Sequence, residues 1–183
     1  MAETALIPHL FRTEFAKIVA VLCKTYGFAN IQLAEDLVSE TFLKATETWG
    51  LKGVPENPTA WLYAVAKNKT KDHFKHEAVF NKKVRPDLTS DSAHANADSL
   101  EIDLSDSNIS DSQLQMLFAV CNPILSKEAQ IGMALRILCG FGIDEIASAL
   151  LTTKSTINKR LHRSKEKFRE AKIELIMPAD DAI

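Results

Sequence analysis

The amino-acid sequence predicts an all-α fold in which a flexible acidic linker joins two small helical domains, the second containing a helix-turn-helix. Apolar residues recur at helical spacing on both sides of a central segment. That segment, residues 87–113, holds seven Asp or Glu residues and no Lys or Arg. Near the C-terminus, a short apolar helix pattern is followed by a turn and a strongly basic helix pattern. We therefore expect a first domain at residues 1–86, a linker at 87–108, a second domain at 109–177 and a tail at 178–183.

The first domain shows the patterns of three amphipathic helices. Two of them are indicated by apolar residues at helical spacing: Phe11, Phe15, Ile18, Val19 and Leu22 in one, and Ala34, Leu37, Val38, Phe42, Ala45 and Trp49 in the other. The third begins at Asn57 and Pro58, because Asn is a good N-cap and proline suits the first helical position. Between the last two helices, Gly50, Gly53 and Pro55 indicate an ordered loop.

The second domain is expected to begin with a helix at Ser110. Ser110 and Gln113 match a capping box, and Ile109 and Leu114 match a hydrophobic staple. This helix should end at Asn122 and Pro123, and a second should follow Ser126.

A helix-turn-helix pattern follows within this domain. Residues 143–151 form its short apolar helix, and Thr153 is the N-cap of its basic helix. Packing of Ile157 and Leu161 on the short helix leaves one set of polar side chains outward, where a major-groove helix would present them: Ser155, Thr156, Asn158, Lys159, His162 and Arg163.

Composition excludes several classes of protein. The chain is 46% hydrophobic and 25% charged, and it lacks both a long apolar segment and an apolar N-terminal leader, so we expect a cytoplasmic protein with no membrane partner. Cys23, Cys121 and Cys139 lie in apolar helical patterns and are interpreted as reduced core side chains. None of the motifs GxGxxG, GxxxxGK[ST] and GxSxG occurs, so we expect neither an enzyme nor a cofactor.

The net charge of −2 conceals a segregation of charge along the chain. Residues 1–86 carry 12 basic against 9 acidic residues, and residues 114–183 carry 10 against 8. Two clusters are sharper: Lys67–Arg85 has seven Lys or Arg and two acids, and Lys154–Lys172 has eight and two. Clustered cations neutralise phosphates, which suggests two separate contacts with nucleic acid. The alternative is a pair of solvated helix faces.

Two stretches resemble bacterial RNA polymerase sigma factors of the extracytoplasmic-function group. Residues 34–45 (AEDLVSETFLKA), with residues 61–68 (WLYAVAKN) and Asp72, resemble conserved region 2 of that family. Residues 142–147 (GIDEIA), with residues 155–165 (STINKRLHRSK), resemble region 4. The resemblance implies a role in promoter recognition, DNA melting and transcription initiation.

The resemblance also implies the partners and the residues that meet them. Asp36, Leu37 and Glu40 would bind the clamp of the largest subunit of core RNA polymerase, and the flap of the second-largest subunit is a further expected contact. Contacts with the melted minus-ten element would come from Leu51, Lys52, Tyr63, Lys67, Asn68 and Lys71, with the loop at residues 51–56 capturing a flipped base. The double-stranded minus-thirty-five element would meet Ser155, Thr156, Asn158, Lys159, His162 and Arg163. Trp61 is interpreted as a core aromatic rather than a stacking platform for an unpaired base.

The chain departs from the family pattern at Ser39, where the common motif has Gln, and at Leu151 and Thr152, where the turn usually has Gly and an apolar residue. Residues 53–62 and 118–123 resemble a subgroup with a large C-terminal extension. The sequence stops about where that extension would begin, so we expect a truncated or natural short form. An anti-sigma protein or the missing C-terminal domain is a further expected partner.

Two other interpretations remain open at this point. A helix-turn-helix regulator that acts without core polymerase would account for the second domain but leaves residues 34–72 unexplained. A metal site at Asp72, His73, His76 and Glu77 is disfavoured, because no further His or Cys accompanies these residues at a recognisable spacing.

Overall fold

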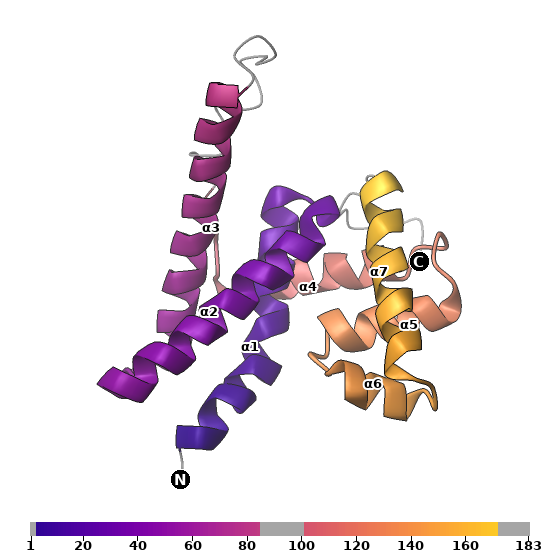
Figure 1. Ribbon diagram of the computed structural model, residues 1–183, viewed down its shortest axis with the longest axis horizontal. Coiled ribbons are helices and arrows are strands. Elements are labelled where there is room, and N and C mark those ends of the chain that lie inside the picture. The colour runs from indigo at the N-terminus through magenta and orange to yellow at the C-terminus, as the bar shows by residue number, and fades with distance from the viewer. Residues whose placement is uncertain (1–2, 85–100, 172–183) are drawn as a thin grey trace.

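The computed structural model describes residues 3–84 and 101–171 of the chain, and every regular element in these ranges is helical. The predicted all-α class is therefore confirmed (Figure 1). The elements are α1 (Glu3–Tyr26), the short 3-10 helix η1 (Phe28–Asn30), α2 (Ile31–Lys52), α3 (Pro58–Val84), α4 (Asp106–Val120), α5 (Lys127–Ile137), α6 (Ile143–Ala149) and α7 (Lys154–Ala171). Within the described ranges, none of the helices has the length and apolar character needed to cross a bilayer.

Three of the predicted helix starts are found where their capping residues indicated. The side chain of Asn57 accepts a hydrogen bond from the backbone N–H of Ala60 at 3.0 Å, and Pro58 is the first residue of α3. The hydroxyl of Ser126 accepts from the N–H of Ala129 at the start of α5. Thr153 does the same for Thr156 at the start of α7. Each cap satisfies a backbone donor that has no partner within its own helix.

The predicted start of α4 at Ser110 is wrong, because the helix begins at Asp106 with Ser105 as its N-cap residue. Asp103 accepts hydrogen bonds from the backbone N–H and the hydroxyl of Ser105, which holds the turn before the helix. The hydroxyl of Ser110 donates instead to the carbonyl of Asp106, one turn earlier in the same helix. Residues 106–108, assigned to the linker, are thus helical, and most of that segment lies outside the described residues.

Helix α1 lies at the centre of the packing, between α2 and α4 (Figure 1). Helix α3 packs on α2 and stands at one side of the molecule, and α5, α6 and α7 gather on the other side of α1. Among the described residues, the buried apolar side chains form one continuous cluster, to which each of the seven α-helices contributes. This cluster includes Phe15, Phe28, Leu62, Met116 and Phe168.

The C-terminal helices contact the N-terminal helices directly. The rings of Phe28 in η1 and Phe168 in α7 are fully buried, with centroids 4.7 Å apart. Gly140, which follows α5, has a φ of 70° and lies so close to α1 that an added Cβ would be 3.3 Å from the carbonyl oxygen of Arg12. Glycine suits both the left-handed backbone and the close approach. The division of the chain into two domains stays a prediction.

The interpretation of all three cysteines as core residues is wrong for two of them. Cys23 is buried in α1, and burial raises the pKa of its thiol. Cys121 and Cys139 are exposed, because each follows the last turn of a helix, where the chain turns toward solvent.

Candidate functional site

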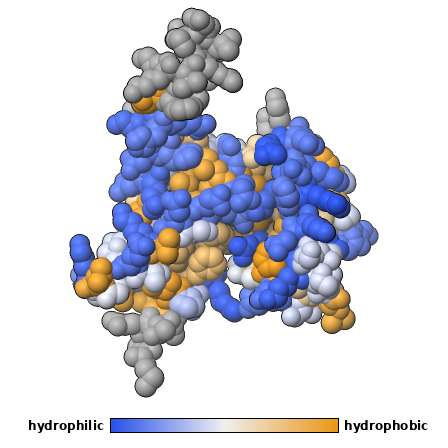
Figure 2. Space-filling view, viewed as in Figure 1, coloured by the Kyte–Doolittle hydropathy of each residue, from blue (hydrophilic) through white to orange (hydrophobic). Residues whose placement is uncertain are grey.

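The basic helix α7 presents a polar face and buries an apolar one. Ile157 and Leu161 are buried in the same cluster as Ile146 of α6. Helices α6 and α7 therefore pack against each other through the apolar residues that the sequence spacing indicated. All of the residues predicted to face outward are exposed: Ser155, Thr156, Asn158, Lys159, His162 and Arg163. Figure 2 shows hydrophilic residues over much of α7 and α3 on the viewed face.

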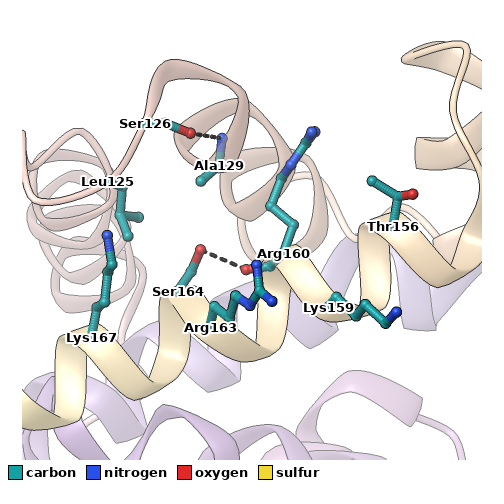
Figure 3. Close-up of a pocket in the computed structure, with 9 residues that line it drawn as sticks. All are labelled: Leu125, Ser126, Ala129, Thr156, Lys159, Arg160, Arg163, Ser164 and Lys167. Carbon is teal, nitrogen blue, oxygen red and sulfur yellow. Dashed lines mark hydrogen bonds between the residues drawn. The ribbon is translucent and has the colours of Figure 1, made fainter.

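A basic cleft of about 370 Å³ separates α7 from the start of α5 (Figure 3). Its cationic side chains are Lys159, Arg160, Arg163 and Lys167, and none of the nine lining residues is acidic. The N-terminus of α5, capped by Ser126, opens on the same cleft and adds a positive partial charge. The cleft therefore has the electrostatic character of a binding site for phosphate oxygens. Arg160 and Lys167 were not singled out in the sequence, although they lie one turn from predicted contact residues.

A second cleft, of about 250 Å³, lies between α7 and α2. Asn158 and His162 line it from α7, opposite Asp36 and Ser39 of α2. The predicted minus-thirty-five face is thus divided: Lys159 and Arg163 line the basic cleft, and Asn158 and His162 line the cleft beside α2.

The residues predicted to bind the polymerase clamp have different surroundings on α2. Asp36 is exposed and accepts a hydrogen bond from Gln32 at 3.1 Å. Glu40 is exposed and forms an ion pair with Lys69 of α3 at 2.8 Å. Leu37 is only 6% exposed, so its side chain packs in the core rather than facing a partner. The two carboxylates are consequently the accessible part of this group.

The predicted minus-ten residues lie on α3 and in the last turn of α2. The prediction of a loop from residue 50 or 51 is wrong, because α2 continues through Lys52, with Gly53 as its C-cap residue. Asn68, Lys71, Leu51 and Lys52 are exposed, and the Leu51 side chain is 88% exposed. Lys67 lies beside a groove of about 520 Å³ that is also lined by residues 101–104, and its ammonium group is 3.9 Å from the carboxylate of Glu101. The end of the acidic segment thus runs along the basic face of α3.

Tyr63, also in the predicted minus-ten group, is half-buried. Its hydroxyl donates a hydrogen bond of 2.6 Å to Glu14, a buried carboxylate on α1 that also accepts from Lys17 at 3.0 Å. Burial and the bond to Glu14 raise the pKa of the Tyr63 hydroxyl. Glu14 was not identified from the sequence, because a single Glu in an amphipathic helix ordinarily faces solvent.

Trp61 packs edge-on against Trp49, with ring centroids 5.3 Å apart, and is partly buried against the core. This packing supports the interpretation of Trp61 as a core aromatic. The metal-site alternative gains no support, since no group of three or more potential metal ligands occurs among the described residues. His73 of that group packs edge-on against Phe74.

In the described residues all regular elements are helical, and two helices present basic faces, one of them just after a short inter-helix turn. These are features of a DNA-binding protein. Residues 11–79, which span most of α1 through α3, match the family model described as Sigma-70 region 2. Residues 11–79 are thus similar to region 2 of the sigma-70 family, in agreement with the resemblance noted for residues 34–72.

The chain is also 31% identical over 155 residues to an uncharacterized protein of Rhizobium meliloti (strain 1021). The aligned region covers 82% of this chain and 36% of that protein. The chain therefore spans about a third of the length of the curated relative that it matches. This alignment extends beyond the residues of the region 2 match, whereas the assignment of region 4 stays a prediction.

Proposed function

We propose that the chain is a sigma factor of the extracytoplasmic-function group, which binds core RNA polymerase in the cytoplasm and directs it to promoter DNA. The observation that carries this proposal is the match to Sigma-70 region 2 over residues 11–79. Its role in transcription initiation is that of the family, and the assignment of particular residues to particular contacts is our own.

The clamp of core polymerase would bind Asp36 and Glu40 on α2, the exposed carboxylates of the predicted group. We expect Asp36→Ala combined with Glu40→Ala to abolish binding of the polymerase while the fold stays intact. Glu47→Ala is the matched control, since Glu47 is an exposed carboxylate on the same helix. Wild-type affinity in the double variant, measured by fluorescence anisotropy, would remove the clamp assignment.

The minus-ten element would meet the basic face of α3 together with the end of α2. Helix α3 supplies two cations, Lys67 and Lys71, and the amide of Asn68. The last turn of α2, just before the loop that leads to α3, supplies Leu51 and Lys52. Extruding a base costs a few kcal/mol of unstacking, which a cationic channel and an apolar contact can offset. Because the Tyr63 hydroxyl is bonded to Glu14, Tyr63 would contribute a ring edge rather than a hydroxyl.

The minus-thirty-five element would receive α7 in its major groove. Asn158 can pair with adenine, and Lys159 and Arg163 can pair with guanine or hold phosphate. Arg163→Ala should weaken binding of a promoter duplex by about 1–3 kcal/mol if the guanidinium reads a base. Arg169→Ala is the control, since Arg169 lies on the same helix, outside both clefts, next to Glu166.

The decisive experiment is co-elution of the purified chain with bacterial core RNA polymerase in size-exclusion chromatography at moderate salt. Co-elution is the expected result. Failure, with a polymerase shown to accept another sigma factor, would favour a helix-turn-helix regulator that acts alone, and such a regulator would bind palindromic duplex DNA as a dimer. Contact with the polymerase flap, an anti-sigma protein or a further domain would be examined once co-elution is established.

A further inference from the structure

Leu151, in the turn between α6 and α7, combines a strained backbone with an exposed apolar side chain. Within the described ranges it is the one residue other than glycine with a positive φ, whereas Gly27, Gly53 and Gly140 have the other positive values. Its side chain is 95% exposed, more than any other large apolar side chain in the described part of the chain. A left-handed backbone is unfavourable for a residue with a Cβ, and an exposed leucine gains no packing in return. The fold itself therefore gains nothing from leucine at this position.

The hydrogen bonds at the end of α6 explain why the backbone is left-handed here. The N–H of Thr152 donates to the carbonyl of Ala147 at 2.9 Å, and the N–H of Leu151 donates to the carbonyl of Ser148 at 3.3 Å. With Leu150 as the C-cap, these two bonds form a Schellman motif, in which the next residue is left-handed and is usually glycine. Both bonds use backbone atoms alone, so glycine would form the same turn without strain. The leucine side chain is consequently available for a contact outside the fold.

The surface around Leu151 favours nucleic acid rather than a protein as the partner in that contact. Among the described residues, no other large apolar side chain on α6 or α7 is exposed. Protein-binding surfaces present contiguous apolar patches, whereas Leu151 stands alone beside a basic helix whose Lys159 and Arg163 line the basic cleft. DNA matches this pattern, because its major groove presents one kind of apolar group, the C5-methyl of thymine, between rows of phosphates.

The turn also lies at the end of α7 that is predicted to enter the DNA. Leu151 precedes Lys154, the first residue of α7, by three positions, so their Cα atoms are at most about 11 Å apart. The N-terminal residues of a recognition helix contact base edges, and the major groove of B-DNA is about 12 Å wide. A side chain at this turn can therefore reach the groove that would receive Ser155 and Thr156.

We propose that Leu151 contacts the C5-methyl group of a thymine at the end of the minus-thirty-five element nearest the start of α7, and that this contact selects thymine there. The inference rests on the part of the proposed function that places α7 in a major groove. Polar side chains of α7 would read hydrogen-bonding groups of the bases, and Leu151 adds an apolar contact that glycine could not make. The strained leucine is thus retained for base selectivity at the expense of fold stability.

The contact is tested with a duplex that the full chain, bound to core polymerase, selects from a randomised library. Each thymine of the selected element is then replaced, one at a time, by deoxyuridine, which lacks the C5-methyl group. Fluorescence anisotropy should show one position at which the parent complex loses affinity by about fourfold, the factor expected for one buried methylene-sized group. Leu151→Gly should bind the thymine and deoxyuridine duplexes equally, and as weakly as the parent binds the deoxyuridine duplex.

Three variants separate this contact from an effect on folding. Leu151→Gly keeps the Schellman motif and should unfold at or above the parent temperature, so its weaker binding would not reflect misfolding. Leu151→Asn, which also tolerates a left-handed backbone, should lose the preference for thymine as well. Leu43→Ala, which shortens another exposed leucine, on α2, should keep the parent preference.

A selected element without thymine, or an equal response to deoxyuridine in the parent and in Leu151→Gly, would overturn the contact. If the chain does not bind core polymerase, the proposed function fails, and the selection is repeated with the chain alone. A thymine preference that depends on Leu151 would then still support the contact, because the contact requires only that α7 reads DNA. Selection of no sequence by either route would overturn it.

Discussion

At the scale of single residues, Glu14 of α1 and Tyr63 of α3 form a partly buried polar contact between two of the N-terminal helices. The carboxylate of Glu14 is 6% exposed and accepts from the Tyr63 hydroxyl and the Lys17 ammonium. A buried carboxylate is costly unless donors satisfy it. The bond therefore fixes α3 on α1 and sets the position of the α3 face that is predicted to meet DNA.

Tyr63→Phe should lower the free energy of unfolding by about 1–3 kcal/mol, because it removes a donor from a buried charged acceptor. Tyr26→Phe is the matched control: the Tyr26 hydroxyl is buried and has no hydrogen-bond partner among the described residues, so its loss should be neutral or stabilising. Urea unfolding followed by circular dichroism measures both. Equal effects of the two variants would contradict the role of Glu14.

The two tyrosines of the chain also predict a response to alkaline pH. Burial raises the pKa of Tyr26, and burial with the Glu14 bond raises that of Tyr63, from the ordinary value of 10.0. Since the folded-state pKa is above the unfolded one, this contribution to stability is present below pH 10 and is lost as the pH rises through the folded values. Tyrosinate absorbance should therefore appear above pH 10 in the folded protein and near pH 10 in urea. Titration near 10 in both states would contradict the prediction.

At the scale of elements, the turn between α6 and α7 contains a strained residue. Leu151 has a φ of 48° and is 95% exposed, so it adopts a left-handed backbone without burying its side chain. A left-handed conformation costs a non-glycine residue roughly 1–2 kcal/mol. The turn sets the angle at which α7 leaves α6, and its sequence departs from the family pattern at this position.

Leu151→Gly should raise the free energy of unfolding by about 0.5–1 kcal/mol, which is the relieved strain less the entropy cost of glycine. Leu51→Gly is the control, because Leu51 is 88% exposed but lies in α2, where glycine should cost about 0.5–1 kcal/mol. Thermal unfolding of the two variants should shift in opposite directions. A loss of stability in Leu151→Gly would show that the turn is not strained.

At the scale of the whole molecule, Phe28 and Phe168 join the N-terminal helices to α7 through a fully buried ring contact. Replacement of each ring by Leu keeps an apolar side chain and should cost less than truncation to Ala, which costs about 3–5 kcal/mol, so the fold should survive. In a double-mutant cycle the two changes should couple by about 0.5–1.5 kcal/mol, as aromatic pairs do. Phe168→Leu with Trp49→Phe is the additive control, since Trp49 contacts Trp61 instead. Strict additivity of Phe28 and Phe168 would show that the two halves do not pack in solution.

The elements of the fold were largely predictable, because helical periodicity and capping are local properties of the chain. Asn57, Ser126 and Thr153 mark helix starts with side chains that reach only three residues ahead. The start of α4 was missed because two serines five residues apart both suit an N-cap, and the hydrogen bonds of Asp103 decide between them. The exposure of Cys121 and Cys139 to solvent likewise depends on the residue at which each helix ends.

The chemical character of the predicted site was also contained in the sequence: the basic faces of α3 and α7, the acids of α2, and the polar residues of α7 that face outward. The tertiary structure decided which of these groups meet. It placed Lys165 and Arg136 on Glu35, buried Leu37 and Glu14, and divided the α7 face between two clefts. Such contacts join residues far apart in the chain, and local spacing carries no information about which distant side chain completes a buried charge.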